Sequence, residues 1–211
     1  MLEHTLPVSV PLVPEVTLRL LTEECPLWYA NEAEAARHGL SEPYWAFAWP
    51  GGQALARYVL DHPDLVRGRR VLDFGAGGAI EGIAAALAGA RSVTAADLDP
   101  LACAAAQVNA KLNGVTTLSA TSRDLVGDPG VVEDFDVILA GDVFYDADLA
   151  RRGRAWLKEL GYFGKLVLLG DPARGFLEIE GLHEVARYVA TWDGDTTGTI
   201  TRSTGVYTIT S

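Results

Sequence analysis

Two acidic residues and the glycine-rich segment between them are the residues best suited to binding a cofactor. An apolar run, Val71-Leu72, leads into Asp73 and then into a turn that contains Gly75 and Gly77. Glycines let the backbone pass close to a ligand, and the helix that follows presents free N–H groups to a polar part of it. Asp97 follows the next apolar run roughly 20 residues later, an offset at which a carboxylate accepts hydrogen bonds from ribose hydroxyls. The pattern indicates an adenosine-containing cofactor.

The spacing of the glycines favours one adenosine cofactor over another. A dinucleotide-binding loop needs the order G-x-G-x-x-G, but the sixth position counted from Gly75 is Ile80, which disfavours a nicotinamide-dependent oxidoreductase. S-Adenosylmethionine enzymes instead prefer an acidic residue, one intervening residue and G-x-G-x-G. Asp73, Gly75 and Gly77 fit this order, with Ala79 in the place of the third glycine. A purely structural turn stays open as an alternative, since glycine turns follow many strands.

The elements around this loop alternate between strand and helix, which predicts a parallel sheet with helices on both faces. We expect strands at 70–74, 92–97, 116–121, 135–141 and 165–170. We expect helices at 51–60, 80–88, 100–112, 147–160 and 176–181. Two stretches rich in Val, Tyr and Thr, 184–191 and 199–210, predict a hairpin at one edge of the sheet. The fold class is α/β: a Rossmann-like seven-stranded sheet, mostly parallel, with a C-terminal antiparallel hairpin.

The N-terminal part of the chain carries a weaker pattern. Residues 1–14 are interrupted by prolines and predict an irregular arm, whereas 16–21 has the β character of a short strand. Residues 32–38 predict a helical turn that ends at Gly39. We therefore divide the chain into an N-terminal extension, 1–42, and one domain, 43–211, which is long enough for a single core.

Composition narrows the class of partner and the compartment. The 211 residues carry a formal net charge of −11, which argues against a nucleic-acid substrate because phosphate binding rests on Lys and Arg. Cys25 and Cys103 have neither metal-ligand spacing nor a disulfide pattern, so we expect a reducing cytosol. The four histidines are scattered, so we expect no metal site. No stretch has the pattern of a membrane span or a signal peptide.

Four blocks of sequence, in order along the chain, resemble a known family. They are Pro43-Tyr-Trp-Ala-x-x-Trp-Pro-Gly-Gly-Gln-Ala-Leu55, Asp97-Leu-Asp-Pro100, Gly141-Asp-Val-Phe-Tyr-Asp146 and Gly170-Asp-Pro-Ala-Arg174. These blocks resemble the seven-stranded (class I) protein-lysine methyltransferases that modify the β subunit of electron transfer flavoprotein, which include a mitochondrial enzyme and bacterial relatives. The resemblance departs from the chain at residues 78–82 and does not place the first forty residues.

The resemblance implies S-adenosylmethionine as the cofactor and places eight residues around it. They are Trp49, Asp73, Gly75, Ala76, Gly77, Asp97, Asp124 and Gly141. The family pattern puts Trp49 against the cofactor, the loop 75–77 beneath its methionine portion and Asp73 near its ammonium group. It puts Asp97 at the ribose and the Gly141 backbone at the cofactor's border. Asp124 is expected to reach the adenine amine, with a cap or turn as the alternative.

The same resemblance implies Asp142, Tyr145 and Phe144 as catalytic residues. Methyl transfer from a sulfonium is a direct displacement, so the nucleophile must lie in line with the S–CH₃ bond. A lysine amine, whose ordinary pKa is about 10.4, must first lose its proton. Asp142 follows the fourth strand and can accept a hydrogen bond from the amine, while Tyr145 and Phe144 supply apolar walls. The alternative for Asp142 is an N-cap of the helix that follows.

Three further residues are expected at the substrate mouth: Trp45, Asp171 and Arg174. Trp45 would complete an aromatic channel, although aromatic residues are more often simply buried. Asp171 and Arg174 follow the fifth strand, where they would shape the mouth or form a local ion pair.

These features together favour a cytosolic, S-adenosylmethionine-dependent protein-lysine N-methyltransferase. The resemblance implies the electron transfer flavoprotein β subunit as the substrate, and bacterial relatives suggest a ribosomal stalk protein. Two alternatives remain: a small-molecule amine N-methyltransferase with the same cofactor residues, and a cofactor-binding module without turnover, which Ala79 makes conceivable. We expect no membrane partner.

Overall fold

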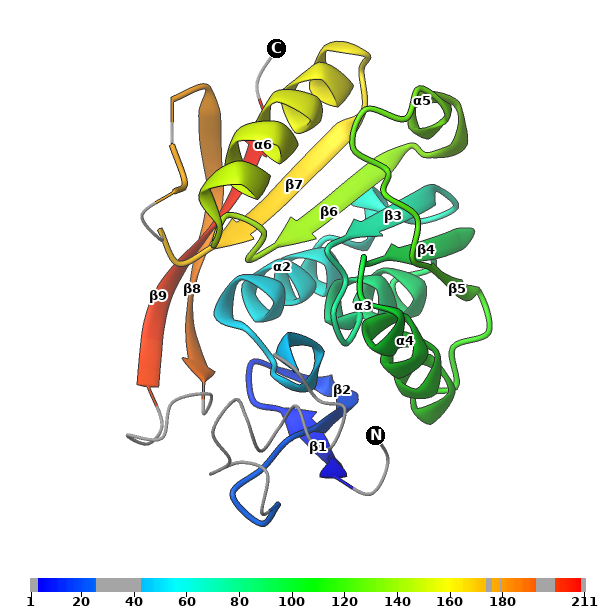
Figure 1. Ribbon diagram of the computed structural model, residues 1–211, viewed down its shortest axis with the longest axis vertical. Helices are drawn as coiled ribbons and strands as arrows, with labels where there is room; N and C mark the ends of the chain where they lie inside the picture. The colour runs from blue at the N-terminus through cyan, green and yellow to red at the C-terminus, as the bar shows by residue number, and fades with distance from the viewer. Residues whose placement is uncertain (1–3, 26–42, 174–175, 179, 193–199, 210–211) are drawn as a thin grey trace.

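A seven-stranded sheet forms the centre of the computed structural model, which describes residues 4–25, 43–173, 176–178, 180–192 and 200–209 (Figure 1). The strands lie in the order β5-β4-β3-β6-β7-β9-β8. Their bounds are β3 Arg70–Phe74, β4 Ser92–Ala96, β5 Leu118–Thr121, β6 Val137–Gly141, β7 Leu166–Asp171, β8 Leu182–Trp192 and β9 Ile200–Ile209. The first five are parallel, and β9 pairs antiparallel with both β7 and β8. The predicted fold class is confirmed, including the C-terminal hairpin.

The order of the strands reverses beside β3. From β3 the chain continues to β4 and β5 on one side, and then β6 pairs with β3 on the other side. Ligands of open α/β sheets bind at such a reversal, outside the carboxyl ends of the strands. The fold therefore places any ligand site near the ends of β3, β4 and β6.

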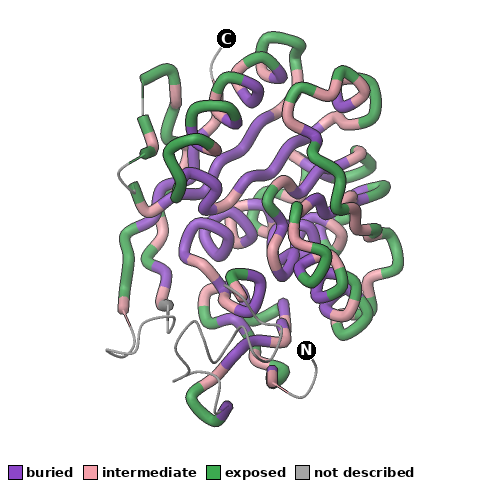
Figure 2. The backbone as a smooth tube through the Cα atoms, viewed as in Figure 1, coloured by how far each residue is buried: buried purple, intermediate pink, exposed green. Residues whose placement is uncertain are grey.

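Helices cover both faces of the sheet. Their bounds are α2 Pro50–Asp61, α3 Ile80–Leu87, α4 Pro100–Leu112, α5 Gly130–Asp134 and α6 Ala147–Tyr162, with short 3₁₀ turns η3 Tyr44–Ala46 and η4 Pro63–Leu65. The central strands β6 and β7 are almost continuously apolar because both of their faces are covered, and Figure 2 shows the central strands as mainly buried. The short helix α5 was not expected from the sequence.

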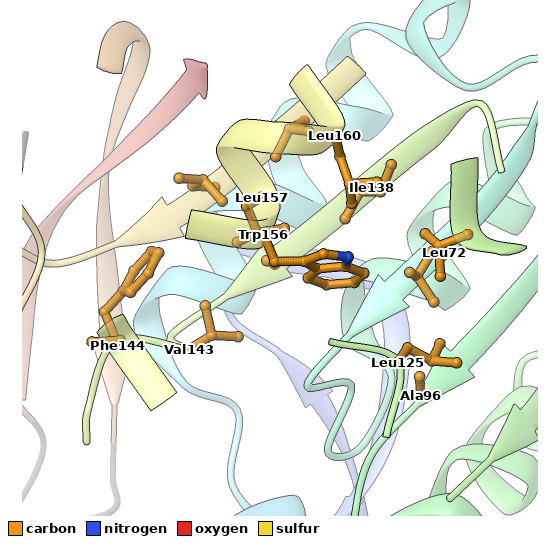
Figure 3. Packing of buried hydrophobic residues seen from close by; sticks show 14 of the residues in the cluster. Leu72, Ala96, Leu125, Ile138, Val143, Phe144, Trp156, Leu157 and Leu160 are labelled. Carbon is orange, nitrogen blue, oxygen red and sulfur yellow. The ribbon is translucent and has the colours of Figure 1, made fainter. Parts of the chain in front are cut away.

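The two faces of the sheet pack into separate apolar clusters. On one face Trp156, Leu157 and Leu160 of α6 pack against alternate residues of β3, β6 and β7, such as Leu72 and Ile138 (Figure 3). The opposite face packs against α2 and α3. The inward residues of α6 recur at helical spacing, which is why this stretch folds as an amphipathic helix.

The prediction of an irregular arm over residues 1–14 is wrong. β1 (Leu6–Val10) pairs antiparallel with β2 (Val13–Leu20), and the hairpin packs beside α2, α3 and α4. Pro7 and Pro14 are tolerated because each strand of a two-stranded sheet has one edge that needs no hydrogen bonds. The predicted strand over 16–21 corresponds to β2. The predicted helical turn at 32–38 lies outside the described residues.

The predicted helix at 176–181 is also wrong, because the described residues of that stretch form turns and irregular backbone before β8. Its signal was short, and Gly175 and Gly181 bracket it. Gly181 has φ of 78°, a left-handed conformation that no α-helix contains.

Candidate active site

A cavity of about 610 Å³ opens at the carboxyl ends of β3, β4 and β6, where the strand order reverses. Its volume falls within the usual range for small-molecule sites. It is lined by the loop after β3, the segments that follow β4, β5 and β6, the aromatic stretch 44–49, and Leu149 and Arg152 of α6. The position is the one that the fold leads us to expect.

The loop after β3 forms a tight turn with its backbone towards the cavity. Gly75 and Gly77 have φ of 69° and 49°, in the left-handed region that glycine adopts without strain, and both line the cavity. A Cβ atom on Gly75 would come within 2.9 Å of Val143 Cγ1, so only glycine fits there. Ala79 also has a left-handed conformation, with φ of 63°. The chain therefore keeps the turn of the third loop glycine, at a strain of about 1 kcal/mol.

Asp97 lies in the cavity wall and fixes the glycine loop. Its Oδ2 accepts a hydrogen bond from the Gly77 N–H at 2.8 Å, and its Oδ1 accepts one from Asp99. Burial raises the pKa of Asp97, and these two N–H donors oppose the rise. The loop and the expected ribose acceptor are thus one hydrogen-bonded unit.

Asp124 also lines the cavity, at its other end. Its Oδ1 accepts a hydrogen bond from the Val126 N–H at 3.0 Å, which is the local turn that the sequence offered as an alternative. Its Oδ2 lies 3.3 Å from Arg152 of α6. The predicted contact of Asp124 with an adenine amine therefore stays a prediction.

Asp73 and Ala76, two of the predicted cofactor ligands, do not line the cavity. Asp73 is fully buried, and its Oδ2 accepts a hydrogen bond from the Gly82 N–H at 2.9 Å. Burial and the neighbouring Glu81 raise the pKa of Asp73 well above its usual value. Ala76 packs against Ala79 and the alanines of β4 and α4. In this structure both residues support the loop from behind, and the ammonium contact expected for Asp73 stays a prediction.

Asp142 lies in the cavity wall in an unusual backbone conformation. Its φ is 55°, which Asp tolerates better than most residues, and its side chain is largely buried. Oδ2 accepts a hydrogen bond from the Gly52 N–H at 2.9 Å. Gly52 is the third residue of α2, so Asp142 caps that helix across 90 residues of sequence.

The N-cap of α6 is a different residue. Asp146 accepts hydrogen bonds from the N–H groups of Asp148 and Leu149. The alternative reading of Asp142, as the cap of the helix that follows it, is therefore wrong. Gly141, which precedes Asp142, lines the cavity as expected.

Three aromatic residues with neighbouring rings line the same cavity as Asp142. The ring of Tyr44 lies 6.0 Å from that of Trp49 and 5.8 Å from that of Tyr145. The Trp49 indole N–H donates to the Tyr44 carbonyl oxygen at 2.8 Å. Trp45 lines the cavity although it is almost fully buried. The predicted residues Trp45, Trp49 and Tyr145 thus share the lining of one cavity with Tyr44.

Two of the remaining predicted site residues, Phe144 and Asp171, do not line the cavity. Phe144 was expected as a channel wall, but it is buried in the core cluster beneath α6 (Figure 3). Val143 lines the cavity instead, and burial in the core cluster favours the apolar Phe144 ring. Asp171 ends β7 fully buried and does not line the cavity. Arg174 lies outside the described residues, so the expected ion pair between the two is not observable.

Sequence reasoning missed Glu81, the second residue of α3. It is 4% exposed, interacts electrostatically with Asp73 and Asp142, and has its pKa raised to about 8. Burial is the main cause, and the charge of Asp142 adds to it. The only signal in the sequence was an acidic residue inside an otherwise apolar helix. Among the described residues no group of His, Cys, Asp and Glu is arranged to hold a metal ion, and no helix is long and apolar enough to cross a membrane.

Known proteins resemble the chain over most of its length. The electron transfer flavoprotein beta subunit lysine methyltransferase of Rattus norvegicus is 44% identical over 167 residues, 79% of this chain and 64% of that protein. The protein of the same name from Xenopus laevis is 44% identical over 174 residues, 82% of this chain and 69% of that protein. The chain belongs to this lysine methyltransferase family. It spans about two-thirds of the length of the relatives it matches.

Two further comparisons concern the methyltransferase fold. A family model described as ribosomal protein L11 methyltransferase (PrmA) matches residues 54–144. The crystal structure of magnesium protoporphyrin IX methyltransferase from Synechocystis PCC 6803, solved with bound SAM, superposes with a TM-score of 0.54 at 14% identity, over 88% of each chain. The structural likeness confirms the methyltransferase fold, and the relatives confirm the resemblance drawn from the four sequence blocks.

Proposed function

We propose that the chain is an S-adenosylmethionine-dependent protein-lysine N-methyltransferase that acts on the β subunit of electron transfer flavoprotein. Its relatives carry this activity in their names, at 44% identity over 79% of the chain. The observation that carries the proposal is the position of Asp142, which lines the same cavity as the aromatic residues Tyr44, Trp49 and Tyr145. A lysine side chain that enters past these rings would meet that carboxylate.

The cavity suits S-adenosylmethionine, whose sulfonium supplies an electrophilic methyl group when it is bound. The backbone of Gly75 and Gly77 forms a surface without side chains, where a Cβ atom on Gly75 would press against Val143. Asp97 stands at the end of β4 with its carboxylate in the cavity wall, where ribose hydroxyls would donate to it. Asp124 and the apolar residues beside it, Leu125 and Val126, line the far end, where they would hold the adenine. The bound cofactor of the structurally similar methyltransferase supports this assignment.

The residues around Asp142 can prepare an amine for attack. Aromatic rings attract a cationic ammonium group through their faces, so Tyr44, Trp49 and Tyr145 would guide a lysine inward and exclude water from it. Removal of water favours the neutral amine, since desolvation lowers the pKa of a lysine. Asp142 would accept a hydrogen bond from the amine and so aim its lone pair at the cofactor. One Asp142 oxygen is already held by Gly52, which fixes the direction of the carboxylate.

The rim of the cavity favours a protein substrate over a small amine. Tyr44, Tyr145 and Leu98 line the cavity and are 48%, 52% and 65% exposed, and Leu101 beside them is 37% exposed. Large apolar side chains gathered at the mouth of a site are typical of a surface that contacts another protein. The net charge of −11 would favour approach of a lysine-bearing segment. The cytosol stays our proposed location, on the evidence of cysteine usage alone.

Transfer of a tritiated methyl group tests the proposal. The chain is incubated with labelled S-adenosylmethionine and, separately, with purified electron transfer flavoprotein β subunit, a ribosomal stalk protein and the small-molecule fraction of an extract. Label in the flavoprotein subunit is expected. Label only in the stalk protein would show that the substrate is that protein and not the flavoprotein subunit. Label only in small molecules would favour a small-molecule amine methyltransferase. Cofactor binding, seen as a melting shift, without label in any fraction would favour a binding module.

A further inference from the structure

Glu81 lies directly behind the two backbone segments that hold Asp142. A Cβ atom on Gly141, the residue before Asp142, would overlap Glu81 Oε1. A Cβ atom on Gly52, whose N–H donates to Asp142, would lie 3.2 Å from the same oxygen. The Glu81 carboxyl group therefore packs against both Gly141, which precedes Asp142 in the chain, and Gly52, which donates a hydrogen bond to Asp142.

In the described part of the chain, the elements that pack most extensively against α3 bring two acidic neighbours to Glu81 and no cation that is not engaged elsewhere. β4, β5 and β6 contain no charged residue, while Asp73 comes from β3 and Asp142 follows β6. The basic residues of the other elements are engaged elsewhere, in the following contacts: Arg57 of α2 with Glu15 of β2 and with Asp61, Arg19 of β2 with Thr5, and Arg70 of β3 with Asp136. A carboxyl group that is buried beside other acids favours its neutral form, and here burial outweighs the hydrogen bonds from the backbone of Glu81 and Gly141, which lower the pKa of Glu81.

We propose that Glu81, as a neutral acid, is a positioning residue that holds Asp142 in place for the amine. The inference rests on the proposed function. Glu81 does not line the cavity, so it acts only through Gly141, Gly52 and Asp142. When Glu81 loses its proton, a second negative charge appears behind Asp142. That charge disfavours the neutral amine that must attack, and it repels Asp142 from its position.

The pH dependence of methyl transfer follows from this charge. The neutral fraction of a lysine, whose ordinary pKa is about 10.4, rises about tenfold per pH unit, so the rate should climb with pH. Burial raises the pKa of Glu81 to about 8, and above that pH the climb in the wild type should flatten. Glu81→Gln keeps the size and the hydrogen-bonding groups of the neutral acid but cannot ionise. Glu81→Leu keeps the approximate size and loses the hydrogen bonds.

The test measures kcat for methylation of the electron transfer flavoprotein β subunit from about pH 6.5 to 9.5, with Glu133→Gln on the exposed face of α5 as the control. The ratio of rates at pH 9 and pH 7 should be at least about fivefold larger in Glu81→Gln than in the wild type. Glu81→Leu should lower kcat by about tenfold or more at pH 7, a loss that Glu81→Gln largely reverses. Glu133→Gln should follow the wild type throughout.

A second readout needs no turnover. A carboxyl group whose folded-state pKa is raised loses its stabilising contribution as pH rises through the interval between its unfolded and folded values. The melting temperature of the wild type should therefore fall relative to Glu81→Gln between about pH 5 and pH 8, while Glu133→Gln stays parallel to the wild type.

Three outcomes separate the inference from the proposed function. Flattening near pH 8 in the wild type, relieved in Glu81→Gln, supports the inference. An active wild type whose profile is parallel to that of Glu81→Gln, or one that shows no flattening at all, overturns the inference alone. A wild type that binds cofactor but methylates no lysine overturns the proposed function, and this role of Glu81 with it.

Discussion

The starts of α2 and α3 are built in the same way but lie in different surroundings. Each helix lacks a capping side chain at its own N-cap, Trp49 in α2 and Ala79 in α3. In each the third residue is a glycine whose N–H donates, at 2.9 Å, to an aspartate at the carboxyl end of a parallel strand. Asp73 serves α3 from within β3, and Asp142 serves α2 from just beyond β6.

The difference between the two aspartates lies in access. Asp73 is fully buried, whereas Asp142 is 8% exposed and lines the cavity. One carboxylate thus serves a helix alone, while the other caps a helix and also faces the space where an amine would arrive. A cap holds a carboxylate rigidly. We infer that the hydrogen bond from α2 orients Asp142 for its role in the cavity. The equivalent hydrogen bond from α3 to Asp73 serves stability alone.

The largest expected effect separates charge from capping at Asp142. Asn can still accept a hydrogen bond from the Gly52 N–H and tolerates the left-handed backbone, so Asp142→Asn should change the free energy of unfolding by less than about 1 kcal/mol. An uncharged amide oxygen is a weaker hydrogen-bond acceptor than a carboxylate and would orient the amine less well, so kcat should fall by about 100-fold or more. Urea unfolding and methyl-transfer kinetics on the same preparation measure both. A large loss of unfolding free energy with unchanged kcat would show that Asp142 only caps α2 and has no catalytic role.

The matched variants Gly82→Ala and Gly52→Ala test how much space each helix start leaves for a Cβ atom. A Cβ atom on Gly82 would lie 2.7 Å from Asp73 Oδ2 and 3.1 Å from Val93, both deep in the core. The variant should lose about 1–3 kcal/mol of unfolding free energy. On Gly52 the nearest atoms, at 3.0 and 3.2 Å, belong to the side chains of Ile80 and Glu81. Alanine also favours the helix, so Gly52→Ala should stay within about 1 kcal/mol of the wild type.

Calorimetry of these two variants ranks the sites directly. Equal destabilisation would mean that the two helix starts are equally crowded, contrary to the contacts described above.

Asp73→Asn asks whether the buried cap needs a charge. Burial raises the pKa of Asp73, so its ionised form destabilises the fold as pH rises above the unfolded value of about 4. Asn keeps the hydrogen bond from Gly82 and does not titrate. The melting temperature of Asp73→Asn should therefore gain on the wild type as pH rises above about 4.

The same variant checks the predicted contact of Asp73 with the cofactor. Because the side chain does not line the cavity, the Kd for S-adenosylmethionine in isothermal titration should change by less than about threefold, or about 0.7 kcal/mol. A much larger loss of affinity would restore Asp73 as a cofactor ligand.

The smallest effect is expected at the N-cap of α3. Ala79→Gly removes the strain of a left-handed alanine but also removes a buried methyl group that packs among Ala76, Ala95 and Ala106. The two effects are each about 1 kcal/mol and oppose each other, so chemical unfolding should detect a net change below about 1 kcal/mol. Strong destabilisation would show that the methyl group is needed for packing, and strong stabilisation that the turn is strained.

Much of this arrangement could be predicted from the sequence, and the rest depended on distant contacts. The order of strands and helices followed from apolar periodicity, and the glycine loop, Asp97 and the aromatic stretch lie at the cavity as expected. The hydrogen bond between Asp142 and Gly52 could not be predicted from the sequence, because the two residues are 90 positions apart. The inward direction of Phe144 was hidden because adjacent residues of a loop give no periodicity. The role of Glu81 was not predicted because it depends on Asp73 and Asp142, which come near Glu81 only in the folded chain.

The mass of electron transfer flavoprotein β subunit, before and after incubation with the chain and S-adenosylmethionine, tests the central claim most directly. The account predicts that the intact mass rises by one or more methyl groups, that fragmentation places them on lysine, and that Asp142→Asn abolishes most of the increase. An unchanged mass in the presence of wild-type chain that demonstrably binds the cofactor would contradict the account.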